Sequence, residues 1–217
     1  MLDAEREKAR YVALFAFEQE LKLQGFRLVA GVDEAGRGPL AGPVAAAAVI
    51  LPEDADLPGL NDSKVVPAPR RAALAEKIRA VAVAWSVGIA SVAEIDALNI
   101  RRASFLAMRR ALDGLRPMPD HVIVDGSIIP EFFLPQTGVV RGDALVAAVA
   151  AASIVAKVTR DRLMDELDAA FPCYGFCRNK GYPTPEHLEA LQKYGPSPFH
   201  RRSFAPVKHL LEYRGSC

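Results

Sequence analysis

LVAGVDEAGRGPLAGP, residues Leu28–Pro43, joins an apolar run to two adjacent acids and a glycine-rich turn. The apolar residues suit a buried strand, and the acids Asp33 and Glu34 follow them directly. Acids at the end of a buried strand are costly unless something pairs with them, and hard cations such as Mg²⁺ take carboxylate oxygens. The turn that follows contains Gly36, Arg37 and Gly38. Glycines let a backbone approach a ligand closely, so the stretch predicts metal ligands beside a backbone cradle. The simpler alternative is two solvated acids before an ordinary turn.

Apolar runs and turn residues on both sides of this stretch predict an α/β fold with a mixed sheet. The first strand, Arg27–Val32, pairs with Val44–Leu51 as a hairpin. Further strands are expected at Ala82–Ala90, His121–Val124 and Gly138–Val140. Helices are expected over residues 1–24, Pro69–Val81, a short segment after Ser91 with a capping box to Glu94, Asn99–Leu115, Gly142 to about Leu167, Pro185–Lys193 and Pro206–Tyr213.

The composition is that of a globular protein, with 217 residues of which 51% are hydrophobic and 24% charged. This length suits one sizeable core. The apolar runs are too short to cross a bilayer, and residues 1–24 suggest an amphipathic helix rather than a signal peptide. The three cysteines are Cys173, Cys177 and Cys217. An odd number without a framework indicates a reducing compartment, so we expect the cytoplasm; Cys173 and Cys177 could form half a zinc site, but a second pair is lacking.

Charge is distributed unevenly although the net charge is only +1. From Arg178 to Cys217 there are seven Lys/Arg and three Asp/Glu, a balance of +4, so the other 177 residues carry −3. An acidic body with a basic end suits a phosphate polymer lying across a carboxylate site. We therefore expect a catalytic domain over residues 1–170 and a basic, helical, substrate-binding part over 171–217. A solvated helical tail is the alternative.

Three acidic segments share one pattern, in which an acid lies at the end of an element with a glycine nearby. They are Asp33-Glu34, Asp125-Gly126 and Gly142-Asp143. In open α/β sheets ligands gather at strand ends, and carboxylates that meet there repel each other unless cations separate them. Two divalent cations about 3.5–4 Å apart are a known solution for phosphodiester hydrolysis. A helix N-cap for Asp143 and a plain turn for Asp125-Gly126 remain open.

Asp33 and Glu34 cannot both face one metal pair from a regular strand, because neighbouring residues point to opposite faces. We expect Asp33 to be the central, bridging ligand. Glu34 would reach the site through a bend at the strand end, through its backbone carbonyl or through water.

A series of motifs continues this pattern in order along the chain. They are GVDEAGRGPLAGPV (Gly31–Val44), LNDSK (Leu60–Lys64), VDG (Val124–Gly126), GD (Gly142–Asp143), AASIVAKVTRD (Ala151–Asp161), YGF (Tyr174–Phe176), NKGYPTPEHL (Asn179–Leu188) and HRRSFAPVK (His200–Lys208). Together they resemble ribonuclease HII, the type 2 ribonucleases H. They span most of the chain after residue 27, and only residues 1–24 lack a marked family motif.

The resemblance implies an α/β, ribonuclease H-like fold, with a mixed central sheet flanked by helices and a small helical C-terminal part. It implies an endonuclease with two Mn²⁺ or Mg²⁺ ions that hydrolyses the RNA strand of RNA–DNA hybrids. The family also cuts 5′ of single ribonucleotides in duplex DNA, giving 5′-phosphate and 3′-hydroxyl ends, and so serves ribonucleotide and RNA primer removal. By motif, the catalytic, metal-binding acids fall on Asp33, Glu34, Asp125 and Asp143.

The family's substrate contacts are carried over by motif in the same way. Gly36, Arg37 and Gly38 would read the ribose 2′-hydroxyl, the group that distinguishes RNA from DNA. Tyr182 would sense the RNA–DNA junction; without the family pattern it would be taken for a core aromatic. Further candidate contacts are Lys64, Ser153, Lys157, Lys180, Arg201 and Arg202. For the basic ones a solvated surface position is an equally good interpretation.

Three rival interpretations differ in what they require of the sequence. A type 1 ribonuclease H or a nuclease–transposase relative shares the fold and the acids, but lacks the glycine-arginine-glycine turn and the GYPT segment. A nucleotide-binding module would use Gly36–Gly42 as a phosphate loop, which lacks the Gly-Lys-Ser/Thr ending. A non-catalytic nucleic-acid binder has no use for four clustered acids. We expect a monomer that binds RNA–DNA hybrids and ribonucleotide-containing duplexes and has no membrane association.

Overall fold

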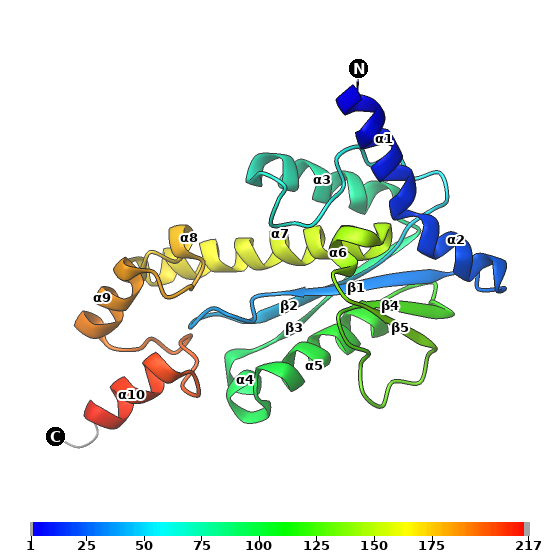
Figure 1. Cartoon of the computed structure of the whole chain (residues 1–217). Helices are drawn as coiled ribbons and strands as arrows, with labels where there is room; N and C mark the ends of the chain where they lie inside the picture. The colour runs from blue at the N-terminus through cyan, green and yellow to red at the C-terminus, as the bar shows by residue number, and fades with distance from the viewer. Residues whose placement is uncertain (1, 215–217) are drawn as a thin grey trace.

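The computed structural model describes residues 2–214 and shows a central sheet between two layers of helices (Figure 1). The strands are β1 (Val29–Ala35), β2 (Val44–Ile50), β3 (Ala84–Ala90), β4 (His121–Asp125) and β5 (Gln136–Val139). Their order in the sheet is β3-β2-β1-β4-β5. The β1–β2 and β2–β3 pairs are antiparallel, whereas β1–β4 and β4–β5 are parallel. The sheet is therefore mixed, and the predicted hairpin is confirmed.

Helices cover both faces of this sheet (Figure 1). They are α1 (Leu2–Leu14), α2 (Ala16–Leu23), α3 (Ala68–Val81), α4 (Val92–Leu98), α5 (Ile100–Asp113), α6 (Gly142–Leu145), α7 (Ala147–Ala170), the 3₁₀ turn η1 (Pro172–Tyr174), α8 (Phe176–Asn179), α9 (Pro185–Tyr194) and α10 (Ala205–Arg214). One face packs against α7 and α3, the opposite face against α5. Helix α8 packs against the C-terminal part of α7, and α9 and α10 lie further out (Figure 1).

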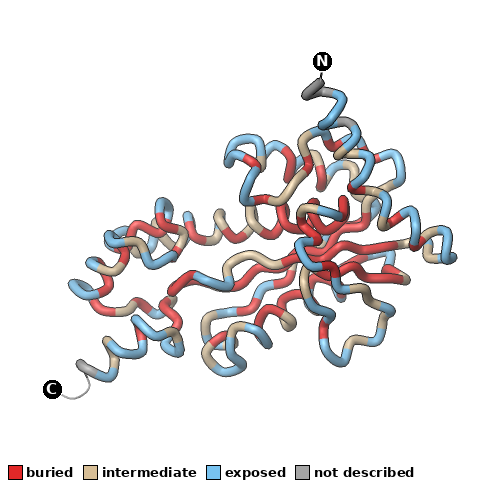
Figure 2. Tube along the Cα trace, viewed as in Figure 1, coloured by how far each residue is buried: buried red, intermediate tan, exposed pale blue. Residues whose placement is uncertain are grey.

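Strict alternation along β1 and β2 assigns side chains to the two faces. Val32 and Ala46 pack in the cluster under α5, whereas Ala47 and Val49 pack under α7 and α3. Both faces of β2 and of the first five residues of β1 are thus buried, and red traces run through the middle of the sheet in Figure 2. By the same alternation, Asp33 faces the α7 side and Glu34 the α5 side.

Helix α7 crosses β1 at Gly31 in very close contact. A Cβ built on Gly31 would lie 2.2 Å from the carbonyl carbon of Ala148 and 2.3 Å from the nitrogen of Val149. Only a residue without a Cβ permits this approach. Gly31 therefore sets the distance between α7 and the sheet, and it does so only two residues before Asp33.

Two helices differ from the predicted ones. The expected helix over residues 1–24 is divided at Phe15 into α1 and α2, and the expected helix from Gly142 is divided into α6 and α7. Val146 interrupts the second one with an extended backbone (φ −129°, ψ 125°). Its side chain is buried in one cluster with Val29 and Ile123, so packing on the sheet overrides helical continuity there. The predicted capping box between Ser91 and Glu94 is confirmed.

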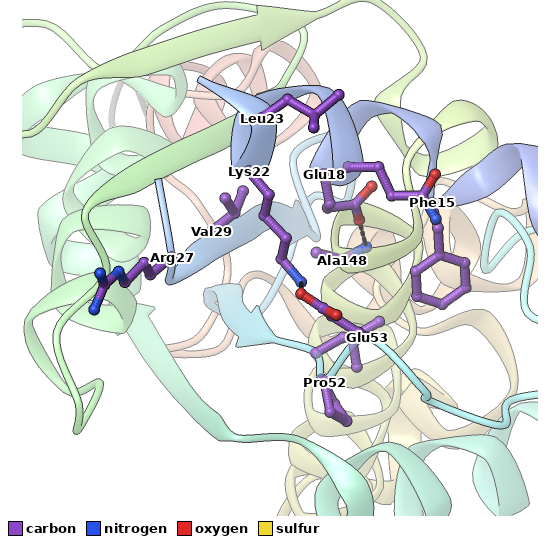
Figure 3. A pocket seen from close by; sticks show the side chains of 11 residues that line it. Phe15, Glu18, Lys22, Leu23, Arg27, Val29, Pro52, Glu53 and Ala148 are labelled. Carbon is purple, nitrogen blue, oxygen red and sulfur yellow. Dashed lines mark hydrogen bonds and ion pairs between the residues drawn. The ribbon is translucent and has the colours of Figure 1, made fainter. Parts of the chain in front are cut away.

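The N-terminal helices are tied to α7 by a buried carboxylate. Glu18 of α2 is 7% exposed, and its Oε1 accepts a hydrogen bond of 2.8 Å from the nitrogen of Ala148 (Figure 3). Burial raises the pKa of Glu18, while the hydrogen bond from Ala148 lowers it. Beside it, the Lys22 ammonium pairs with Glu53 at 2.8 Å (Figure 3). A carboxylate at the N-terminus of a helix complements the helix dipole, so α2 anchors the start of α7.

Within residues 2–214, the helices are too short or too polar for a membrane-spanning segment.

We predict that Gly31→Ala destabilises the protein, because the added methyl group forces α7 away from β1. Overpacking of this kind costs about 1–3 kcal/mol. Urea unfolding of both proteins would measure the loss. Gly38→Ala is the matched control, since a Cβ there would meet the Tyr182 ring at an ordinary 3.5 Å. Equal stability of the Gly31 variant and the wild type would contradict the close packing of α7 on β1.

Candidate active site

Three acids from three elements meet at one edge of the sheet. Asp33 lies in β1, Asp125 ends β4 and Asp143 lies in α6. One carboxylate oxygen of each is within 4.8 Å of the others. The parallel register that pairs Val32 with Val124 brings the first two acids side by side. Three of the four predicted acids, which lie far apart in the sequence, thus form one cluster, although β1 continues for two residues beyond Asp33.

The turn between β5 and α6 places the third acid. Arg141 adopts a left-handed conformation (φ 61°), and the nitrogen of Gly142 then donates to Oδ1 of Asp125 at 2.7 Å. Asp143 is the second residue of α6, whose N-cap position is occupied by Arg141. The N-cap alternative for Asp143 is therefore wrong. Gly126, with φ +73°, provides the turn that follows Asp125, so this acid ends a strand and precedes a turn at once.

Glu34 lies apart from this cluster because β1 does not end before it. The strand pairs regularly through Asp33–Ala47, Glu34–Ala46 and Ala35–Ala45. A bend at the strand end, one of the three routes considered for Glu34, is therefore wrong. The Glu34 side chain points to the α5 side, where its Oε1 pairs with Arg37 at 3.0 Å. Glu34, Arg37 and Asp125 line a hollow of about 130 Å³. Asp125 is therefore shared between the acid cluster and this hollow.

The electrostatics of the cluster suit a bound cation. Burial raises the pKa of Asp33 well above its usual range, and the charges of Glu34, Asp125 and Asp143 raise it further. Burial also raises the pKa of Asp143, against the lowering effect of Lys64, whose Nζ lies 3.1 Å from its Oδ2. Lys64 is largely exposed, so it offsets little of the repulsion. Clustered, partly dehydrated oxygen ligands of one charge are the donor set that hard divalent ions prefer.

A buried arginine supports the glycine-rich turn from below. Arg201 is 0% exposed. Its guanidinium donates to the carbonyl oxygens of Gly36 (2.5 Å), Arg37 (2.9 Å) and Gly42 (3.0 and 2.9 Å). The expectation that Arg201 contacts phosphate is corrected by this burial. It binds the main chain of the turn, which leaves the opposite surface of the turn free for a ligand.

Tyr182 lies beside the same turn. Its side chain is 45% exposed, so the core-aromatic alternative is wrong. A Cβ built on Gly38 would lie 3.5 Å from Cε1 of the ring, which places the ring edge directly next to this glycine. The predicted glycine-arginine-glycine element and the predicted tyrosine are thus neighbours in space.

The remaining residues predicted to contact the substrate differ in how far they are buried and in what they bind. Ser153 is 2% exposed, and its Oγ accepts from the nitrogen of Ser63 at 3.2 Å. It therefore holds the LNDSK loop onto α7, which corrects its expected role as a surface contact. Lys157 pairs with Asp161 at 2.6 Å, and Lys180 pairs with Asp165. Arg202 is exposed, and its main-chain nitrogen is held by Asp96.

Sequence reasoning missed three buried polar residues near Tyr182. They are Arg160, His187 and His200, all at most 1% exposed. In the sequence, the only signal for Arg160 is its position four residues after Ala156, which puts it on the apolar face of the Ala-rich helix. Spacing of this kind puts it on the buried stripe, but only the tertiary structure shows what it binds there.

Comparison with known proteins extends these observations. The family model for ribonuclease HII matches residues 30–207. A ribonuclease HII from Geobacillus kaustophilus is 54% identical over 215 residues, covering 96% of this chain and 82% of that protein. One from Moorella thermoacetica is 58% identical over 198 residues, covering 91% and 96%. The crystal structure of ribonuclease H2 from Pyrococcus horikoshii OT3 superposes with a TM-score of 0.75 at 28% identity, covering 88% of this chain and 100% of that one. The matched range contains the acid cluster, the glycine-rich turn and Tyr182.

We predict that Asp33→Asn raises the melting temperature in the presence of a chelator. The folded-state pKa of Asp33 lies above its unfolded value of about 3.8, so the fold is favoured by protonation and loses stability as pH rises through that window. The side-chain amide of the variant does not ionise, so the variant should not lose stability in this way. Thermal melts in EDTA at pH 4–8 should therefore show a flatter pH dependence for the variant.

The same melts with Mg²⁺ or Mn²⁺ test the metal site. Divalent ions should stabilise the wild type and have much less effect on Asp33→Asn, by mass action on the folded state. Asp113→Asn, an exposed acid at the end of α5, is the control and should respond like the wild type. Equal metal-induced shifts in all three proteins would contradict the assignment.

Proposed function

The chain belongs to the ribonuclease HII family and is a ribonuclease H, and we propose that its acid cluster hydrolyses the RNA strand of RNA–DNA hybrids with divalent metal ions. The observation that carries this proposal is the meeting of Asp33, Asp125 and Asp143 beside the glycine-rich turn. An acid cluster alone does not choose a substrate. Its position next to a backbone cradle and an exposed tyrosine favours a ribose-containing strand.

The residues that would hold two Mg²⁺ or Mn²⁺ ions are Asp33, Glu34, Asp125 and Asp143. When bound, such ions supply a nucleophile from water and stabilise the leaving oxygen of an in-line displacement. Asp33 and Asp125 lie on the neighbouring strands β1 and β4, and Asp143 of α6 comes within 4.8 Å of both, so each of these acids could share an ion with the others. Asp125 borders both the cluster and the hollow that Glu34 lines, so these two acids suit the second ion.

Substrate recognition would involve two neighbouring features. Arg201 binds the carbonyl oxygens of Gly36 and Arg37 from inside the protein. The other main-chain groups of the turn Gly36–Gly38 would therefore be available to a ligand. We propose that these groups contact the 2′-hydroxyl of the ribonucleotide. The strand would be cut on the 5′ side of that ribonucleotide, leaving 5′-phosphate and 3′-hydroxyl ends. Tyr182 would pack on the adjoining deoxyribose and so detect the RNA–DNA junction.

Basic side chains around the site would bind the phosphates of the duplex. Lys64 extends over Asp143 with a side chain that is 76% exposed. Arg202 lies in the exposed segment after Arg201, while Lys157 and Lys180 are partly screened by their acidic partners. We propose that residues 171–217 serve substrate binding, in line with their +4 charge balance.

We propose that the enzyme removes single ribonucleotides and RNA primers from DNA, as a monomer in the cytoplasm. Cys173 and Cys177 are exposed free thiols, which suits a reducing compartment; Cys217 lies outside the described residues.

Cleavage of a duplex that carries one ribonucleotide tests the proposal directly. The substrate should be cut 5′ of the ribonucleotide in the presence of Mg²⁺ or Mn²⁺, and its all-DNA twin should remain intact. Chelation should stop the reaction. A protein that binds this duplex without cutting it under any divalent ion would overturn the proposed activity.

We predict that Tyr182→Ala lowers kcat at a single ribonucleotide much more than it raises KM, as expected for a contact made mainly in the transition state. An all-RNA hybrid, which offers no deoxyribose next to the cut, should be less affected. Tyr194→Ala is the control, because Tyr194 is also a tyrosine of the C-terminal part, exposed to 52%. Equal slowing of both substrates by Tyr182→Ala would remove the junction role.

A further inference from the structure

Tyr182 is exposed, yet buried side chains bind the main chain on both sides of its turn. His187 is 0% exposed, and its Nδ1 lies 2.8 Å from the carbonyl oxygen of Tyr182. Arg160 is 1% exposed, and its guanidinium donates to the carbonyl oxygen of Lys180 at 2.6 Å. The residue proposed to touch the substrate is therefore held from beneath by two residues that the substrate cannot reach.

The hydrogen-bond chain behind His187 has a single consistent arrangement of protons. The carbonyl of Tyr182 can only accept, so Nδ1 of His187 carries the proton and its Nε2 accepts. That Nε2 lies 3.0 Å from Nε2 of His200, which must then donate. His200 uses its unprotonated Nδ1 to accept from the nitrogen of Ser197 at 3.0 Å. The chain thus runs from Ser197 through both imidazoles to Tyr182 without a conflict.

Burial keeps both rings neutral, as this arrangement requires. It lowers the pKa of His187, and burial together with the neighbouring His187 lowers the pKa of His200 to about 4. The rings of Tyr174 and Phe176 pack against the pair. Two neutral, packed and hydrogen-bonded rings form a stiff support.

Arg160 connects this support to the glycine-rich turn. Besides Lys180, its guanidinium donates to the carbonyl oxygens of Ala41 at 3.0 Å and Pro43 at 3.4 Å. A Cβ on Gly36 would lie 2.4 Å from Nε of Arg160, so the arginine also packs directly beneath the turn. One side chain therefore binds the segments that carry both proposed recognition elements.

The two segments also meet through their main chains. The nitrogen of Leu40 donates to the carbonyl oxygen of Gly181 at 2.8 Å. A Cβ on Gly181 would lie 2.6 Å from the carbonyl oxygen of Ala41. The approach leaves no room for adjustment, so the position of Tyr182 relative to Gly38 is fixed by this contact together with Arg160 and His187.

We propose that His187 and Arg160 are positioning residues for junction recognition: they fix the main chain of the Tyr182 turn and so hold its ring at a set place beside Gly38. This inference rests on the proposed role of Tyr182. Misplacement of a reacting group by about 1 Å can cost on the order of 10²-fold in rate, so a loosened turn should reduce the rate at a junction while substrate affinity changes little.

Two amide substitutions of His187 provide a matched pair. In His187→Asn the amide nitrogen takes the place of Nδ1 and can still donate to Tyr182. In His187→Gln the amide lies near Nε2, so it satisfies His200 and leaves the carbonyl of Tyr182 without its donor. We expect His187→Gln to lower kcat on a single-ribonucleotide duplex on the order of tenfold, with KM nearly unchanged and a smaller loss on an all-RNA hybrid. His187→Asn should keep most of the rate. Arg160→Lys keeps the positive charge but loses the planar guanidinium with its several N–H donors. It should lower kcat on the single-ribonucleotide duplex in the same way as His187→Gln.

Combination with Tyr182→Ala separates positioning from a merely structural role. Both bonds go to main-chain oxygens, so they persist without the tyrosine ring, and each substitution should lower the melting temperature equally in either background. In the Tyr182→Ala background, however, His187→Gln should cause less than about a twofold further loss of kcat, because the ring that His187 positions is gone. Arg160→Lys should cause a smaller fold-loss there than in the wild type, and the remaining loss should come from the glycine-rich turn that Arg160 also binds.

The outcomes distinguish this inference from the function on which it rests. The same fold-loss of kcat with and without the ring, or equal loss on junction and all-RNA substrates, would overturn the positioning roles while leaving the junction role of Tyr182 intact. Equal rates for His187→Asn and His187→Gln would overturn the role of His187. Unchanged junction kinetics in Tyr182→Ala alone would refute the proposed function of the ring, and the positioning roles with it. If His187→Gln does not fold, Arg160→Lys alone decides between these outcomes.

Discussion

The contact of α7 with β1 at Gly31 controls the geometry of the active site. Two residues after Gly31, on the same face of the strand, lies Asp33. Four residues before Ala147, where α7 begins, lies Asp143 on α6. A bulkier residue at position 31 would separate the strand from the helix, and the two acids would separate with them. Glu18 fixes the same place from the other side by binding the nitrogen of Ala148. The N-terminal helix α2, outside the range matched by the family model, thus contributes to the placement of the site.

This rigid placement holds together groups that repel each other. Three carboxylates lie within reach of one cation, and burial raises the pKa of two of them. Such a cluster lowers the stability of the metal-free fold, which the surrounding core must offset. The core does so with small residues at close distance: the strands β1 and β2 and the first half of α7 consist largely of buried alanine and valine. Dense packing with short side chains leaves the acids little freedom to move apart.

Particular residues show what the sequence reveals and what it does not. The acids Asp33, Asp125 and Asp143 could be grouped from sequence because strand ends and helix starts gather at one edge of an α/β sheet. The orientation of Glu34 could not be predicted, because the length of β1 beyond Val32 depends on pairing with Ala45 and Ala46 of β2. Arg201 and Ser153 were among the candidate substrate contacts carried over by motif, but both are buried in the structure. Their burial follows from carbonyl and amide partners far away in the chain, which local patterns do not contain.

Two buried arginines place positive charge beneath the glycine-rich turn of a protein whose net charge is near zero. Burial lowers the pKa of Arg201 to about 9 and lowers that of Arg160, yet at neutral pH a group with such a pKa remains charged. Main-chain carbonyls accept their hydrogen bonds. A carboxylate partner would cancel the charge, whereas carbonyl dipoles stabilise it and leave the net field intact. Both guanidinium groups therefore lie charged directly beneath the glycine-rich turn, whose backbone they bind or contact. Removing either charge would weaken this field as well as the turn, so the arginines link shape and electrostatics at one place.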